Sequence, residues 1–251
     1  PDASTRTAIK FGNTTHRVGP FRCRVLGASV SQYKGSSSRA VMFEPGAEEA
    51  VVRNLQADDI ETLLYFSDNS GAATLLAQKC SIEEAVINGC AGRLVDVHGG
   101  RNGSTTKTLV KLTLRDVRVY GASKLMQIRQ ADKVKLLRVL VDDHTVDVTE
   151  PYFATVIDVA GFRAHHCYLD GLRAGFAMTT CPSFYVSRCD FVDFSGGTVV
   201  LQDNGGNTNA RWRYNDAIGF TWSKDTPGTA STGLTEYPLA ISSTSDFLTV
   251  S

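Results

Sequence analysis

The sequence has no excess of charge of either sign, since 26 Lys and Arg residues are balanced by 26 Asp and Glu residues. A neutral total provides no field of one sign that could hold nucleic acid or an anionic membrane surface. No apolar run approaches the length of a membrane span. Nucleic acid and membranes are therefore not expected among the partners of this chain.

A secretory signal is also missing, because residues 1–6 contain no apolar stretch. Six cysteines in 251 residues are too few for a disulfide scaffold. They form no Cys-x-x-Cys pair and no zinc-like grouping with His. We therefore expect synthesis in a reducing cytoplasm, with no metal and no other cofactor.

Helical periodicity and tight hairpin turns are both scarce between residues 60 and 222. This region instead repeats a three-point apolar motif whose last two points, two residues apart, leave a strand on the same face. The seven copies are Ile60-Leu63-Tyr65, Ile82-Ala85-Ile87, Leu114-Val117-Val119, Leu136-Val139-Val141, Ala164-Cys167-Leu169, Val186-Cys189-Phe191 and Trp212-Asn215-Ala217. Their first residues follow at steps of 22, 32, 22, 28, 22 and 26. Self-similarity with such a period predicts stacked repeats.

A second apolar strand follows most copies of the motif. These strands contain Leu94–Val97, Leu125–Ile128, Val156–Val159, Phe176–Met178 and Val199–Leu201. Loops at Gly99–Thr106 and around His144–Tyr152 account for the longer steps. Two or three short strands in each turn of about 22 residues describe one coil of a parallel β-helix. The alternative is an antiparallel β-sandwich, which would need hairpin signals between most strands.

On these motifs, residues 60–222 resemble the right-handed parallel β-helix superfamily, which includes pectin lyases, polygalacturonases and phage tailspikes. The resemblance implies an all-β chain wound as a single-stranded right-handed solenoid of about seven coils, with non-repeating N- and C-terminal segments. Cys167 and Cys189 share one motif point in successive coils. We therefore expect them to stack inside the core as reduced thiols.

The two ends differ from the repeats. Residues 1–59 show no clean period and are expected to form an N-terminal segment and cap, which an open stack of strands requires. Within them, Pro45–Leu55 fits either a short amphipathic helix or another irregular coil. Residues 223–251 pass from a Ser-, Thr-, Gly- and Pro-rich stretch to apolar clusters, and we expect a docking tail.

Candidate chemistry is limited to outward-facing carboxylates. Alignment of the motifs places Asp142 and Asp170 in neighbouring coils, and glycoside hydrolysis needs paired carboxyls about 5 to 9.5 Å apart. Asp142-Asp143-His144 is superficially similar to the adjacent Asp pair of polygalacturonases. The Asn-x-Asp, Gly-His-Gly and Arg-x-Lys patterns of those enzymes are missing, and a polar turn explains the Asp pair more simply. We therefore predict no catalytic residue.

Leu140 and Tyr168 stand out in a different outward row, where a monomer facing water would present charged or small polar residues. Together with the apolar residues of the tail, they are our candidate interface residues. The candidates in the tail are Leu234, Tyr237, Leu239, Ile241, Phe247, Leu248 and Val250.

Two hypotheses about function follow from this pattern. The first is a non-enzymatic structural protein of the virion, a cement or decoration protein on a tailed-bacteriophage capsid. It would be made in the host cytoplasm and assemble with itself, with a trimer favoured. Its other partners would be the major capsid protein or another virion protein, with a surface glycan as a further candidate. The second is a tailspike-like hydrolase or lyase that cleaves polysaccharide with Asp142 and Asp170.

Overall fold

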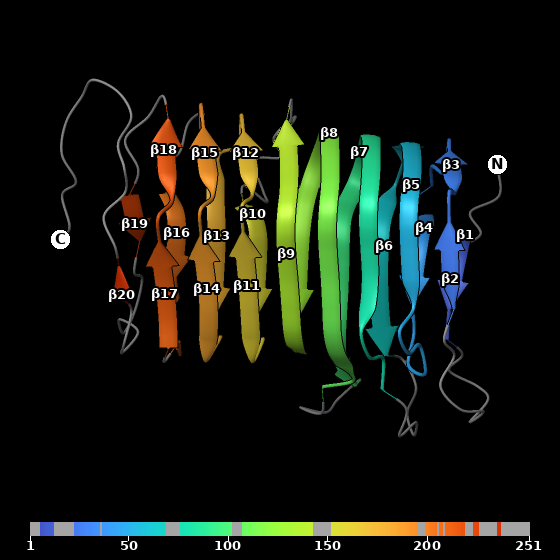
Figure 1. The fold of residues 1–251 in the computed structure, drawn as a ribbon, viewed down its shortest axis with the longest axis horizontal. Coiled ribbons are helices and arrows are strands. Elements are labelled where there is room, and N and C mark those ends of the chain that lie inside the picture. The colour runs from blue at the N-terminus through green and yellow to red at the C-terminus, as the bar shows by residue number, and fades with distance from the viewer. Residues whose placement is uncertain are drawn as a thin grey trace.

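The chain is arranged as two layers of strands that run side by side along the molecule. The computed structural model describes residues 6–12, 23–35, 37–68, 76–101, 107–142, 152–194, 199–204, 206–207, 209–218, 223–225 and 235–236, and within these ranges every regular element is a strand. They are β1 (Thr7–Phe11), β2 (Arg24–Leu26), β3 (Ser29–Ser31), β4 (Arg39–Phe43), β5 (Val51–Ile60), β6 (Thr62–Asp68), β7 (Cys80–Arg101), β8 (Leu109–Arg129), β9 (Ala131–Asp142), β10 (Tyr152–Ile157), β11 (Gly161–His165), β12 (Tyr168–Asp170), β13 (Ala174–Thr179), β14 (Ser183–Ser187), β15 (Asp190–Val192), β16 (Val199–Asp203), β17 (Asn209–Arg213), β18 (Asp216–Ile218), β19 (Ser223–Asp225) and β20 (Thr235–Glu236). In Figure 1, β11, β12, β14, β15, β17 and β18 form the front layer, and β10, β13 and β16 lie behind them.

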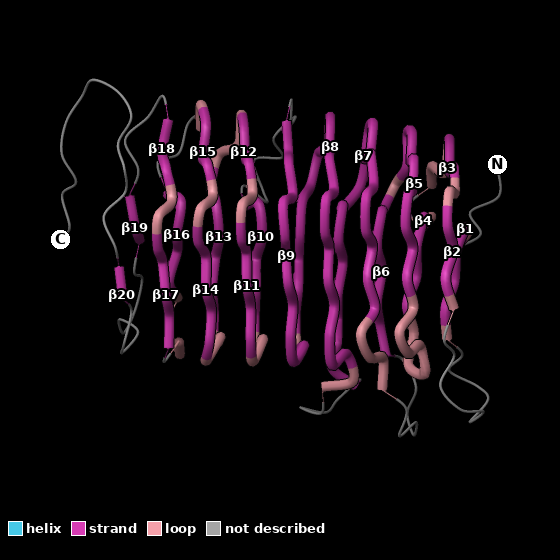
Figure 2. Tube along the Cα trace, in the orientation of Figure 1, coloured by secondary structure: helices cyan, strands magenta, loops and turns pink. Residues whose placement is uncertain are grey.

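Every ladder between the described strands is parallel. Strand β9 pairs with β8 on one side and with both β11 and β12 on the other. The same pattern continues from β11 to β14 to β17 and from β12 to β15 to β18. Figure 2 shows the strands in the same orientation, with loops that join one strand to the next. The all-β, parallel prediction is confirmed, the antiparallel sandwich is wrong, and the arrangement is compatible with a β-helix.

Six of the seven motif copies lie in register with one another. Ile82 pairs with Leu114, which pairs with Leu136, and the row continues through the remaining copies. The first copy, Ile60-Leu63-Tyr65, is wrong. The residues in register with the second copy are Val52, Leu55 and Ala57 of β5. Ile60 ends that strand opposite Cys90, so the first copy ran across a corner of the chain rather than along one strand.

Of the two alternatives for Pro45–Leu55, the short helix is wrong, and the segment leads into a further strand of the stack. Strand β5 begins at Val51 and is held between β2 and β3 on one side and β7 on the other. Parallel pairing with both neighbours outweighs a weak helical pattern, because it satisfies the backbone groups of the whole segment. Parallel pairing extends before residue 60, to β1, and beyond residue 222, to β19 and β20.

The motif has a backbone cause. Two residues after its first point, each circuit of the chain has one residue in the left-handed region, with φ between 52° and 56°. These residues, which we call the corner row, are Asn54, Glu84, Asp116, Arg138, His166, Arg188 and Tyr214. A left-handed residue interrupts the strict alternation of a strand, so that Leu136, Val139 and Val141 all point inward and are buried. The spacing of three followed by two is therefore the signature of a corner.

The interior between the layers is a continuous apolar core. Phe153, Phe162, Phe176, Phe184, Phe191 and Trp212 are fully or almost fully buried and contribute several edge-on ring contacts. As expected, Cys167 and Cys189 stack next to each other in this core as free thiols. Burial away from water raises the pKa of Cys189.

Two buried asparagines replace apolar residues in the circuit that ends the described core. The Asn215 Oδ1 accepts a hydrogen bond from the Cys189 backbone N at 3.0 Å, and the Asn207 Oδ1 accepts one from the Cys181 N at 2.6 Å. Each amide therefore satisfies a backbone donor inside the core, where an unpaired donor would be costly.

The corner row leads to a prediction at Arg188, which is exposed and has a φ of 53°. Arg188→Val should lower the free energy of unfolding by about 1–2 kcal/mol, because a β-branched residue is strained in the left-handed region. Arg188→Gly should change it by only about 0.5 kcal/mol, since relief of strain offsets the greater freedom of the unfolded chain. Urea denaturation measures both. Arg163→Val, at an exposed strand position of β11, is the control and should be nearly neutral; an equal loss there would contradict the corner explanation.

Candidate functional site

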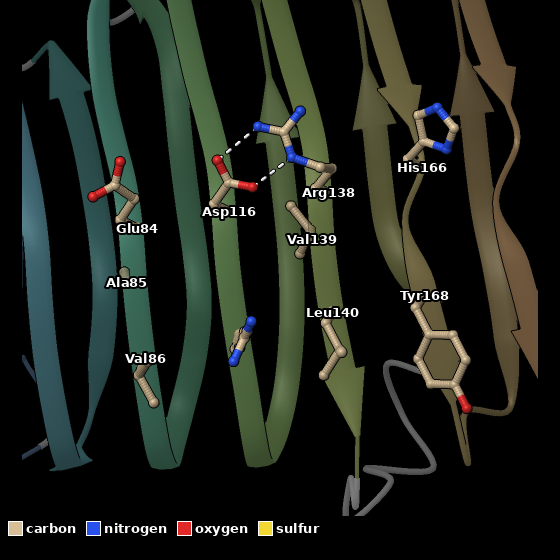
Figure 3. Close-up of a pocket in the computed structure, with 10 residues that line it drawn as sticks. Glu84, Ala85, Val86, Asp116, Arg138, Val139, Leu140, His166 and Tyr168 are labelled. Carbon is tan, nitrogen blue, oxygen red and sulfur yellow. Dashed lines mark hydrogen bonds and ion pairs between the residues drawn. The ribbon is translucent and has the colours of Figure 1, made fainter.

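An open groove runs along the corner row on the front layer. It has a volume of about 720 Å³. Its lining comes from β7, β8, β9, the turn at His166 and β12: Glu84, Ala85, Val86, Asp116, Arg118, Arg138, Val139, Leu140, His166 and Tyr168. Figure 3 shows these residues as two parallel rows, one of them the corner row and the other two positions further along each strand.

The corner row of the groove is charged. Arg138 donates two hydrogen bonds to Asp116, from Nε to Oδ1 at 2.5 Å and from Nη2 to Oδ2 at 2.7 Å. The hydrogen bonds from this guanidinium are the main cause that lowers the pKa of Asp116. His166 follows in the next circuit and Glu84 precedes Asp116 (Figure 3). The row thus has two acidic residues, Glu84 and Asp116, before Arg138 and His166, so that charges of both signs share one polar edge.

The second row of the groove, Val86, Arg118, Leu140 and Tyr168, is apolar except for the exposed Arg118. Val86 is 36% exposed, and Leu140 and Tyr168 are half-buried neighbours in the paired strands β9 and β12. The structure thus brings together two of our nine candidate interface residues. The other seven, Leu234, Tyr237, Leu239, Ile241, Phe247, Leu248 and Val250, lie outside the described residues.

Carboxylates gather beyond the apolar row. Asp142 and Asp170 are adjacent in paired strands, as the aligned motifs implied. The Tyr168 hydroxyl donates a hydrogen bond to the Asp170 Oδ2 at 3.4 Å. Burial and the neighbouring charges of Asp142 and Asp193 raise the pKa of Asp170. The other two members of the expected Asp142-Asp143-His144 group lie outside the described residues.

A second carboxylate pair follows on the same layer. Asp190 of β15 is in register with Asp216 of β18, and burial together with the charge of Asp216 raises the pKa of Asp190. We call Asp142, Asp170, Asp190, Asp193 and Asp216 the acidic stripe. Alignment of the motifs predicts that Asp190 and Asp216 share one row. It does not predict that Asp193 adds its charge to the stripe, because the position of Asp193 depends on the bend after β15.

Cations gather on the other side of the corner row. Lys133 and Lys135 of β9 and Arg163 of β11 line a second groove of about 550 Å³, together with Asp132. Burial and the charges of Lys111, Arg163 and Lys133 lower the pKa of Lys135. We call Lys111, Lys133, Lys135, Arg163 and Arg211 the basic stripe. Within the ranges that the structure describes, none of these five forms an ion pair.

The expectation that the surface has no field of one sign is therefore wrong. The total charge is zero, but the front layer separates cations from anions across the groove. A sum over the sequence cannot reveal this separation, because register alone decides which charged residues become neighbours.

Groups suited to other chemistry are few. The His165 Nδ1 lies 2.7 Å from the Ser187 Oγ, but burial and the nearby charges of His166 and Arg188 lower the pKa of His165. Among the described residues, no three His, Cys, Asp or Glu side chains are placed to hold a metal ion. The same part of the chain contains no helix long and apolar enough to cross a membrane. Comparison with protein families, curated proteins and solved structures finds no match to this chain.

The raised pKa of Asp170 gives a pH prediction. A carboxyl whose pKa is higher in the folded state destabilises the fold once it ionises, so its penalty grows as pH rises from about 4 through the folded pKa. Asp170→Asn should therefore raise the free energy of unfolding near pH 7 by about 0.5 kcal/mol, the scale of a like-charge pair across strands. At pH 3 it should have little effect.

Thermal denaturation between pH 3 and pH 8 measures this difference. The matched control is Asp116→Asn, which should act in the opposite direction, because the pKa of Asp116 is lowered and its contribution is lost as pH falls. If Asp170→Asn were destabilising at neutral pH, the acidic stripe would not be a site of repulsion.

Proposed function

We propose that the parallel strands form a right-handed solenoid of about seven coils, related to the pectin-lyase-like and tailspike-like β-helix superfamily. The support for this is the parallel register of successive circuits and the left-handed residue that recurs at one corner. A stack of this kind is rigid and presents the same surface position again about every 4.8 Å.

We further propose that the protein is a non-enzymatic structural component of a virion. It would cement or decorate the capsid of a tailed bacteriophage as a homo-oligomer, with the major capsid protein or another virion protein as its further partner. The observation that carries this proposal is the apolar pair Leu140 and Tyr168 in the groove, which is half-buried and has charged side chains on both sides. An apolar centre with a charged rim is how contact surfaces between proteins are built.

Residues 223–251 have the role of a docking tail in this proposal. Its first part, β19 and β20, extends the parallel ladders of β16 and β17. The apolar residues beyond Glu236 would supply the grip on the particle, because strand addition and buried apolar area do not need charge steering. Nucleic acid and membranes have no place in this proposal, and a surface glycan remains a further candidate partner.

The test of this function uses particles of the phage that carries the gene. Quantitative mass spectrometry of purified particles should find the chain in many copies. A chain that ends after Glu236 keeps β20 and should stay folded by circular dichroism, yet it should be lost from the particles. Normal incorporation of the shortened chain would refute the role of the tail. Absence of the full-length chain from particles would refute the structural role itself.

A second function, cleavage of polysaccharide, is favoured by one observation. Asp142 and Asp170 are neighbours, and the pKa of Asp170 is raised, as a general acid requires. Arg138 and His166 precede this pair by four residues on their strands, so they do not lie beside it. We propose the structural role ahead of the enzymatic one, because burial and the charges of Asp142 and Asp193 account for the raised pKa of Asp170.

An assay for turnover separates the two functions. We expect no oligosaccharide release when the protein is incubated with a panel of bacterial capsular and cell-wall polysaccharides, followed by mass spectrometry. Release that disappears in both Asp142→Asn and Asp170→Asn, and persists in the control Asp216→Asn, would establish the enzyme instead. Release that persists in all three variants would point to a contaminant.

A further inference from the structure

The two charged stripes lie on one layer, on opposite sides of one groove. In Figure 1, strands β11, β14 and β17 occupy the lower part of the front layer, and β12, β15 and β18 occupy its upper part. The basic stripe comes from β9 and the lower strands with Lys111 of β8, and the acidic stripe comes from β9, the upper strands and the turn after β15. Along β9, Lys135 precedes the corner residue Arg138 by three residues, and Asp142 follows it by four. The stripes are therefore at similar distances from the groove.

Each stripe is a concentration of like charge without compensation. In the part of the chain that the structure describes, Lys133, Lys135 and Arg163 form no ion pair, and neither do the carboxylates of the acidic stripe. Some cations elsewhere on the surface are paired, as Lys79 is with Glu49 at 2.9 Å and Lys107 with Asp158 at 2.8 Å. Burial, together with the neighbouring like charges, lowers the pKa of Lys135 and raises that of Asp190.

We infer that a second copy of this chain covers the front layer, in a dimer whose two-fold axis runs along the groove, parallel to the direction in which the strands stack. A half-turn about this axis lays Lys135 and Arg163 of each copy on Asp142 and Asp170 of the other, because each cation precedes its corner residue by three positions and each carboxylate follows it by four. Every circuit then faces the same circuit of its partner, and all rows share the interstrand spacing of about 4.8 Å, so these charges meet in register. The contact compensates two cations and two carboxylates of each copy.

The groove itself supplies the centre of this contact. Under the half-turn, the axis runs next to the corner row, and the row with Leu140 and Tyr168 of each copy lies on opposite sides of the axis, as a two-fold contact allows. Arg118 is the exposed cation of that row. It belongs to β8, one circuit before the circuit of β9 in which the acidic stripe begins. Opposite charges at the rim add specificity and speed of association more than affinity, so the apolar centre must contribute much of the stability.

This inference rests on the proposed homo-oligomer and replaces the trimer expected from the sequence. In a ring of three copies, one patch of each copy would have to meet a different patch of the next, with the two patches facing away from each other. Both stripes here belong to one layer, which favours a face-to-face pair. The charge pattern also favours a protein partner with matching register. A polyanion would cover only the basic stripe and would leave the acidic stripe uncovered.

The test measures the mass of the full-length protein by sedimentation equilibrium. The wild type should be a dimer in about 0.05 M salt and dissociate at least tenfold more readily in about 1 M salt, because salt screens charges at the rim. Lys135→Glu with Arg163→Glu makes both stripes acidic, and Asp142→Lys with Asp170→Lys makes both basic. Each double variant should be monomeric at concentrations where the wild type is fully dimeric.

Complementation distinguishes a lost contact from a damaged fold. Equal amounts of the two double variants should form a heterodimer, since an all-acidic face meets an all-basic one. All four changes in one chain exchange the stripes and should restore a homodimer. The control is Gln127→Glu with Thr155→Glu, which adds two carboxylates to paired strands of the back layer and should leave the dimer unchanged.

Several results would overturn the inference. They are a wild type that stays monomeric, a mass of three chains, or double variants that associate as the wild type does. Loss of heparin binding in Lys135→Glu with Arg163→Glu, while the dimer persists, would make the basic stripe a polyanion site instead. The outcome is independent of the virion assay, because a dimer that is absent from particles would refute the proposed function and leave this contact standing.

Discussion

The rest of the structure depends on a single backbone constraint, the left-handed residue that every circuit places at the same point of the parallel ladder. Parallel strands leave no freedom of register once one face is buried, since a slip of one residue would turn the whole apolar set outward. The left-handed residue must therefore recur in every circuit, whatever its side chain. It does so at Asp116, Arg138, His166 and Arg188, none of them a glycine. The ladder on both sides holds these residues in a conformation that they would not adopt alone.

This corner shapes both the inside and the outside of the molecule. Inside, it brings Leu136, Val139 and Val141 onto one buried side, so that the core stays continuous around the bend. Outside, it aligns the side chains of successive circuits along a groove that joins two strands of different surface character. The polar edge, the apolar row and both charged stripes are consequences of stacking the same corner in circuit after circuit.

Charge on this surface is organised by register and not by composition. Neighbouring circuits place Lys135 beside Arg163 and Asp190 beside Asp216, although like charges in such positions repel. A fold does not accumulate such repulsion for its own stability, because Asn or Thr would serve equally well at these outward positions. A contact partner that compensates both signs gives the repulsion a physical reason, and the layer that carries both stripes defines where that partner would lie.

The sequence by itself determined the repeat, the parallel all-β architecture, six of the seven motif registers and the stacking of Cys167 on Cys189. It could do so because inward positions of a strand are read directly from apolar spacing. The false first motif, Ile60-Leu63-Tyr65, and the false helix at Pro45–Leu55 fell where the pattern is short and where pairing with neighbouring strands decides the conformation. The spacing of three followed by two was present in the sequence, but the left-handed residue that causes it was not predicted. The aligned motifs placed Asp142 beside Asp170, whereas only the tertiary structure showed the basic stripe and the contribution of Asp193, because outward side chains that meet across circuits are separated by 22 or more residues and become neighbours through register alone.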